Sequence, residues 1–204
     1  MRKIGNVPLS AESVASYYTQ CSSKNHKVSS LEQSGKIIRL KRGLYVPNPE
    51  YSGVPLCMEL IANHLCQPSY VSLQSALRFY GLIPERVYNT TSVTTKVSRT
   101  YTNKLGTFTY THCNAECYYI GIVQQHYNDS TFLIATPEKA LCDLISTTKG
   151  LNLRYKNETY QWLEEDIRFD MDSLNNLDVS IFQQYLQVGL KKPAIEQLIK
   201  LITR

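Results

Sequence analysis

The chain has 204 residues, of which 43% are hydrophobic and 19% charged. This composition excludes intrinsic disorder and fits one medium domain, or a small module attached to a larger one. No run approaches the roughly 20 apolar residues of a membrane span, and the first ten residues, MRKIGNVPLS, lack the apolar segment of a secretory signal. We therefore expect a cytoplasmic protein.

The formal charge of +5 is concentrated at the start of the chain. Residues 1–50 contain eight basic and three acidic side chains, whereas the remaining residues contain 14 of each. An excess of positive charge in the first quarter alone suggests a small module that faces a polyanion.

The start of the chain predicts two helices followed by a hairpin. Ser10 is a suitable N-cap for a helix over about residues 11–20, and Gly35 is a suitable stop for a second helix over residues 24–34. A basic turn, Lys41-Arg42-Gly43, follows. On both sides of it apolar residues alternate at strand spacing: Ile38, Leu40, Leu44 and Val46. This is the order of elements in a winged helix-turn-helix.

Three prolines within residues 46–55 interrupt the chain, since proline continues neither a central strand nor a helix interior. We interpret this stretch as a linker. It divides the chain into a winged helix-turn-helix-like DNA-binding module, residues 1–47, and a larger domain, residues 48–204.

The sequence of the larger domain predicts helices, then strands, then helices, an order that is typical of an α+β fold. One predicted helix begins after Ser72 and ends at Gly81. Another begins at Thr136-Pro137-Glu138, where a cap, a first-turn proline and a first-turn acid stand in their preferred places. The predicted helices are 55–65, 73–80, 136–146, 158–168, 178–188 and 193–202, and the predicted strands are 87–95, 106–111, 118–123 and 131–135. We expect an α+β protein in which a winged helix-turn-helix, truncated at its start, precedes a mixed α/β domain with a helical carboxyl-terminal part.

Basic and hydrogen-bonding side chains gather in the predicted hairpin and in the helix before it. A hairpin tip is exposed, so its charges can reach phosphates, and polar side chains on a helix suit contacts with base edges in a groove. The alternative is a solvated basic surface that binds nothing. The candidate nucleic-acid-binding residues are Lys24, Asn25, His26, Lys27, Ser29, Lys36, Arg39, Lys41 and Arg42, with Asn25, His26 and Ser29 as candidates for base contacts.

Motifs for catalysis and metal binding are largely missing from the sequence. There is no phosphate-binding G-x-x-x-x-G-K-[ST], no H-E-x-x-H and no G-x-S-x-G, and no acidic residue is followed two positions later by lysine. Cys113 and Cys117, beside His112, are the nearest approach to a zinc motif, but no second close pair accompanies them. We expect the six cysteines to be reduced thiols, mostly buried, and we expect no catalytic residue, metal or cofactor.

Three segments are similar to the AbiEi-like antitoxins of type IV toxin–antitoxin systems. Residues 35–47 (GKIIRLKRGLYVP) resemble the wing that ends the family's amino-terminal domain. Residues 70–77 (YVSLQSAL), followed by YGLIP at 80–84, resemble the helix after the linker, and residues 135–145 (ATPEKALCDLI) resemble a later signature helix. The segments occur in the family's order, and the likeness covers about residues 24–146.

The resemblance implies a transcriptional regulator and antitoxin that is not an enzyme. Such proteins bind repeats in the double-stranded DNA of their own promoter and repress the operon. They also counteract a nucleotidyltransferase-like toxin without forming a stable complex with it. Only nine residues precede Ser10, so the first helix of a complete winged helix is missing, very short or displaced.

Two other hypotheses remain open from the sequence. One is a protein-interaction module with a vestigial DNA-binding segment, acting through the larger domain, whose many tyrosines suit either sheet packing or an interface. The other is an enzyme that acts on nucleic acid.

Overall fold

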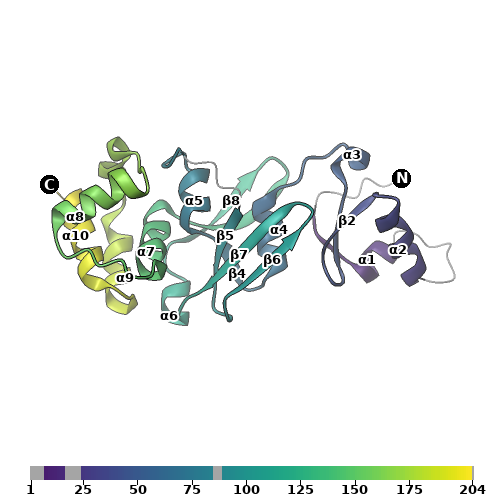
Figure 1. Cartoon of the computed structure of the whole chain (residues 1–204), viewed down its shortest axis with the longest axis horizontal. Helices are drawn as coiled ribbons and strands as arrows, with labels where there is room; N and C mark the ends of the chain where they lie inside the picture. The colour runs from purple at the N-terminus through teal and green to yellow at the C-terminus, as the bar shows by residue number, and fades with distance from the viewer. Residues whose placement is uncertain (1–6, 17–23, 85–88, 204) are drawn as a thin grey trace.

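The structure, a computed structural model, describes residues 7–16, 24–84 and 89–203. It has three regions in a row (Figure 1): two helices and a small sheet at one end, a six-stranded sheet with flanking helices in the centre, and a group of helices at the other end. The expected α+β class is confirmed, and the strands form two separate sheets.

The small end region follows the predicted order of helix, helix and hairpin, with one short strand before it. Its elements are β1 (Leu9–Ser10), α1 (Ala11–Ser16), α2 (Lys24–Gln33), β2 (Ile37–Lys41) and β3 (Leu44–Pro47). The three strands are antiparallel in the order β1-β3-β2. Ser10 is the predicted cap, because its Oγ accepts the backbone N–H of Ser13. The rest of the predicted first helix, beyond residue 16, lies outside the described residues.

The three-stranded sheet packs on both of its faces. One face lies against α1 and α2 and forms a small core of Val14, Ala15, Val28, Leu31, Ile37 and Tyr45. The alternating residues predicted from the sequence form the other face, where Leu40 and Val46 belong to the main core and Ile38 and Leu44 pack against it. The hairpin is therefore shared between the small region and the centre of the protein, and the short helix α3 (Pro49–Ser52) occupies the predicted linker.

The central sheet has the strand order β6-β7-β5-β4-β9-β8. The pairs β5–β7 and β4–β9 are parallel, and the other neighbours are antiparallel. Strands β5, β7 and β9 match predicted strands, apart from residues 87 and 88, which lie outside the described residues; β4 and β6 are not indicated by the sequence pattern. The strands are β4 (Ser69–Val71), β5 (Asn89–Thr94), β6 (Arg99–Asn103), β7 (Gly106–His112), β8 (Ile122–Tyr127) and β9 (Ser130–Ala135).

The predicted strand over residues 118–123 is wrong in its first half. Residues Ala115–Tyr118 form the short helix α6, and β8 begins only at Ile122. Tyr118 is buried, and its ring meets the ring of Tyr70 edge-on at a centroid distance of 5.1 Å. Gly121, with φ 62°, then adopts the left-handed conformation that turns the chain into β8.

Helices flank the central sheet and form the carboxyl-terminal region (Figure 1). Helix α4 (Met58–Leu65) begins later than predicted, because Cys57 acts as its N-cap and accepts the N–H of Leu60. Helix α7 (Pro137–Thr147) begins as predicted at the Thr136 cap. The other elements are α5 (Leu73–Phe79), α8 (Lys156–Gln161), a π-helical turn (Trp162–Asp166), a 3-10 turn (Met171–Asn176), α9 (Val179–Val188) and α10 (Lys192–Ile202). None of the helices in the described ranges is both long and apolar enough to span a membrane.

Candidate nucleic-acid interface

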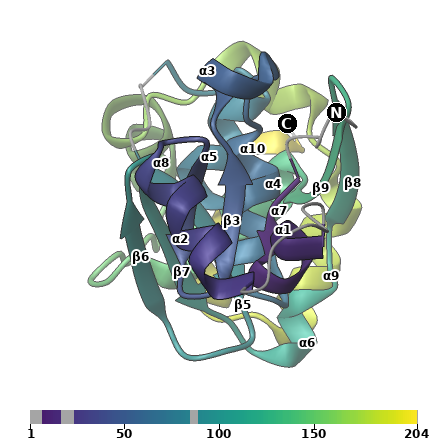
Figure 2. The same ribbon diagram turned by 90° about the vertical axis from the view of Figure 1, so that its right-hand side faces the viewer.

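Helix α2 presents a polar stripe to solvent. His26, Ser29, Ser30 and Gln33 are exposed, and their spacing of three or four residues places them on one side of the helix. The opposite side packs into the small core. Figure 2 shows α1 and α2 facing outward at this end of the molecule, in front of β3. The predicted contact residues His26 and Ser29 therefore lie on an accessible helix face.

The hairpin contributes three exposed basic side chains. Lys36 precedes β2, Arg39 lies within β2, and Arg42 lies in the turn. Gly43 follows with φ 78°, a conformation that favours glycine in a tight turn. Within the part of the chain that the structure describes, neither arginine forms an ion pair, so both guanidinium groups can meet an anionic partner.

Lys41 is only partly exposed, and its ammonium group is engaged within the protein, so its role as a phosphate contact stays a prediction. Its Nζ donates a hydrogen bond of 2.7 Å to the carbonyl of Leu65 at the end of α4 and lies 5.6 Å from the ring centre of Tyr101. The negative end of a helix and the face of an aromatic ring both favour a cation. Lys41 therefore attaches the hairpin to the central sheet and α4, and a hydrogen bond from Asn103 Nδ2 to the Leu40 carbonyl, at 3.2 Å, reinforces the attachment.

The other predicted residues lie on α2. Lys27 is half-buried, and the side chains of Lys24 and Asn25 lie outside the described residues. Their contacts with nucleic acid stay predictions, as do those of the exposed residues above.

The cysteines are mostly buried, as expected. Cys57, Cys66, Cys117 and Cys142 are buried free thiols, Cys113 is a half-buried free thiol, and Cys21 lies outside the described residues. Burial raises the pKa of the Cys113 thiol to about 11, and the negative charge of Asp143 adds to this effect. No group of three or more histidine, cysteine or acidic side chains that could hold a metal gathers within residues 7–16, 24–84 and 89–203.

The raised pKa of Cys113 gives a testable pH dependence. The thiolate is the reactive form, so at about pH 8 iodoacetamide should modify Cys113 roughly 100-fold more slowly than an ordinary thiol. Because the pKa lies near 11, the rate should rise about tenfold for each pH unit towards that value. Peptide mapping by mass spectrometry measures the rate. Equal rates in the native and the urea-unfolded protein at about pH 8 would contradict the expectation.

The interior of the described structure contains an ion pair that no sequence motif indicates. Lys139 and Asp143 lie one turn apart on α7, with Nζ and Oδ1 separated by 2.8 Å, and their side chains are only 0% and 1% exposed. The only sequence signal is the presence of two opposite charges, four residues apart, within an otherwise apolar helix. Such a pair is tolerated in a core only when hydrogen bonds satisfy its remaining polar atoms.

The surrounding residues supply those hydrogen bonds. Tyr70 lies in the middle of β4 and Ser72 directly follows the strand, and both donate to Asp143 Oδ2, at 2.9 and 2.8 Å. Lys139 Nζ donates to the Cys117 carbonyl at 2.7 Å and lies 4.6 Å from the ring centre of Tyr185 on α9. Burial raises the pKa of the Asp143 carboxyl, and the Lys139 ammonium and the two hydroxyl donors oppose that shift. The predicted cap Ser72 makes no side-chain hydrogen bond at the start of α5, because its hydroxyl serves this network.

No protein-family model matches this chain, and no curated protein matches it significantly.

Proposed function

We propose that this protein is a DNA-binding transcriptional regulator and antitoxin of the AbiEi-like kind, and that its small amino-terminal region contacts DNA. The proposal rests chiefly on one observation: an exposed polar face on α2 precedes a hairpin whose two arginines are exposed and free of ion pairs among the described residues. A helix face that can enter a groove and cations that can reach phosphates are the two parts of DNA recognition.

The topology of the small region supports a winged helix. In that fold the strand before the last two helices pairs with the final strand of the hairpin, and the second of these helices enters the major groove. Here β1 pairs with β3, and α2 is the helix directly before the hairpin. Of the residues before β1 only Val7 and Pro8 are described, and they are not helical. In this proposal α2 reads base edges through His26 and Ser29, while Lys36, Arg39 and Arg42 hold phosphates.

Two of the segments that resemble the antitoxin family meet in the core. Residues 70–77 and 135–145 both resemble family segments, and the first supplies Tyr70 and Ser72 while the second supplies Lys139 and Asp143 to one buried network. From this resemblance we propose that the protein represses its own operon at promoter repeats and counteracts a nucleotidyltransferase-like toxin without a stable complex.

Replacing Arg39 and Arg42 together with glutamine should weaken binding to a fragment of the protein's own promoter by roughly 10- to 100-fold at about 0.1 M salt. The slope of log affinity against log salt should fall in magnitude by about 1.8, since each lost phosphate contact removes about 0.9. Gel shift or fluorescence anisotropy over a series of salt concentrations measures both quantities.

A matched control removes two charges outside the hairpin. Lys149 follows α7 and Lys200 lies on α10, and both are exposed. Neither belongs to the small amino-terminal region, so exchanging both for glutamine lowers the net charge equally and should leave the slope nearly unchanged. Wild-type protein that fails to bind promoter DNA at low salt would refute the DNA-binding proposal. So would an equal loss of affinity in both double variants.

A second candidate function is a protein-interaction module whose DNA-binding segment is vestigial. The packing of the hairpin favours it: Leu40 and Val46 belong to the main core and Lys41 bonds to α4, so the hairpin is needed for folding even without DNA. Deleting the amino-terminal region would therefore damage the core, and the arginine double variant is the better test. Protection against the toxin that is retained by a variant unable to bind DNA would favour this candidate.

A further inference from the structure

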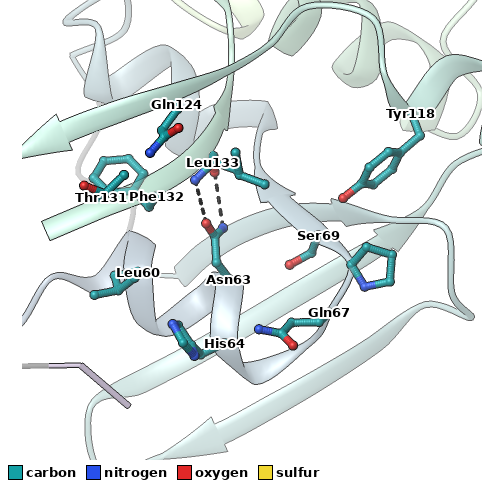
Figure 3. Close-up of a pocket in the computed structure, with 11 residues that line it drawn as sticks. Leu60, Asn63, His64, Gln67, Ser69, Tyr118, Gln124, Thr131, Phe132 and Leu133 are labelled. Atoms are coloured by element: carbon teal, nitrogen blue, oxygen red, sulfur yellow. Dashed lines mark hydrogen bonds between the residues drawn. The ribbon is translucent and has the colours of Figure 1, made fainter. Parts of the chain in front are cut away.

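A cavity of about 480 Å³ opens beside the central sheet, and none of the residues that line it belongs to the basic hairpin. Helix α4 supplies Leu60, Asn63 and His64 to its wall, and strands β8 and β9 and the start of β4 supply most of the rest. Figure 3 shows these side chains surrounding a common space. A volume of 300–1,000 Å³ is typical of sites for small molecules.

The cavity exists because two neighbouring strands separate. β4 and β9 are paired only at Val71 and Ile134. On the side that faces β4, the residues of β9 before Ile134 therefore pair with no strand, while their other side pairs with β8. Asn63 fills part of the gap: its Nδ2 donates to the Leu133 carbonyl at 3.2 Å, and its Oδ1 accepts the Leu133 N–H at 2.6 Å (Figure 3). A side-chain amide thus substitutes for a strand at Leu133, and the remaining opening is lined by α4 as well as by β4, β8 and β9.

One buried hydroxyl in this cavity lacks a partner. Ser69 is only 4% exposed, and its Oγ makes no hydrogen bond in the structure. Figure 3 shows this hydroxyl and that of Tyr118 both directed into the space between α4 and β9. Buried polar groups are nearly always hydrogen-bonded, and an unsatisfied one costs free energy. A ligand that bonds to Ser69 would remove that cost.

The lining contains no formally charged residue. Its polar groups are amides, hydroxyls and one imidazole, and burial lowers the pKa of His64, which keeps its ring neutral at physiological pH. An ionic ligand would lose hydration here without gaining a counter-charge. Leu60, Phe132 and Leu133 add apolar surface, which suits the faces of a flat molecule that carries its polar groups at its edges.

We propose that this cavity binds a neutral heterocycle with amide-type donors and acceptors, of the size of a nucleobase or nucleoside, through Ser69, the Tyr118 hydroxyl and the amides of Gln67 and Gln124. The site is separate from the proposed DNA-binding surface, and its existence does not depend on DNA binding.

Titration calorimetry and ligand-observed NMR on the full chain test the proposal, with uracil, cytosine, adenine, hypoxanthine and their nucleosides as probes. At least one probe should bind saturably, and its nucleoside should bind more tightly than its 5′-monophosphate. Removing the hydroxyl in Ser69→Ala should weaken binding about 3- to 10-fold, as for loss of one hydrogen bond. Gln124→Trp, at an exposed position on β8, should block the cavity and abolish binding.

Ser92 provides a matched control. It is also a fully buried strand serine whose Oγ lacks a partner, but it does not line the cavity. Ser92→Ala should therefore bind the probes as the wild type does. The proposal is overturned if no neutral probe binds at millimolar concentration, if monophosphates bind as tightly as nucleosides, or if Ser69→Ala and Gln124→Trp both retain wild-type affinity. None of these outcomes bears on the DNA-binding proposal, which the promoter titration tests separately.

Discussion

Exchanging Lys139 for methionine is expected to lower the free energy of unfolding by about 3–5 kcal/mol, because the Asp143 carboxylate is left buried without its counter-charge. In a chain of this size such a loss corresponds to a fall in Tm of roughly 6–20 °C. Tyr70 and Ser72 still donate to Asp143 in the variant, but two neutral hydroxyls do not replace an ammonium group at 2.8 Å. Urea and thermal unfolding followed by circular dichroism measure the change.

The loss should depend on pH in a defined direction. Without Lys139 the pKa of the buried carboxyl rises further above its value in the unfolded chain, so the folded variant takes up a proton more readily. The free energy of unfolding that the variant loses relative to the wild type should therefore be smaller at about pH 5 than at about pH 8. The variant's stability should fall as pH rises through the raised pKa of Asp143. A loss that does not vary over this range would show that Asp143 is not the group responsible.

A double variant separates charge from packing. Lys139→Met combined with Asp143→Asn removes both charges and keeps an acceptor for Tyr70 and Ser72, so it should recover more than half of the stability lost in the single variant. Lys200→Met, at an exposed position on α10, is the surface control and should change stability by less than about 0.5 kcal/mol. A double variant as unstable as the sum of its two single variants would contradict the ion-pair account.

Elements with strong local signals were predictable from the sequence. The hairpin is correct because the alternation of Ile38, Leu40, Leu44 and Val46 follows the strand period, and this face is the one buried against the main core. The start of α7 is correct because Thr136, Pro137 and Glu138 act through contacts within a single turn. In both cases the determining interactions lie within a few residues of each other.

Elements set by distant contacts were not predictable in this way. β4 has three residues and is a strand because β5 and β9 lie beside it. β6 is a polar edge strand, in which Arg99 and Thr100 face solvent, so it lacks an apolar pattern. Ser72 looks like a cap, but its hydroxyl bonds to a residue 71 positions away. The Ser72 hydroxyl bonds to the buried Asp143 carboxylate and does not cap the helix, because an unsatisfied buried charge costs more free energy than an uncapped helix end.

The candidate sites follow the same division. Charge distribution identified the basic hairpin, but it could not separate Arg39 and Arg42 from Lys41, whose partner Leu65 is 24 positions away. The cavity lined by Ser69 and the Lys139–Asp143 network gave no recognisable motif, because their residues come from elements spread over half of the chain.

Gly121→Ala is expected to lower the free energy of unfolding by about 2–5 kcal/mol, from backbone strain and overpacking together. Gly121 has φ +62°, and a Cβ at this position would lie 2.8 Å from Lys139 Cβ and 3.1 Å from Ile181 Cγ2. Real Cβ atoms do not approach so closely, so α7 or the loop before β8 must shift. Thermal and urea unfolding of the variant measure the loss.

Gly150→Ala isolates the strain from the clash. Gly150 has φ +73°, and nothing lies within 4 Å of the Cβ that alanine would add, so this variant should lose only about 1–2 kcal/mol. Equal losses of stability in the two variants would mean that the side chains around Gly121 move aside at no cost in free energy. A larger loss at Gly121 would place the cost in the contact with α7. In that case Gly121→Ala combined with Lys139→Met should lose less than the sum of the single variants, because a helix already released from its buried ion pair can shift to admit the extra methyl group.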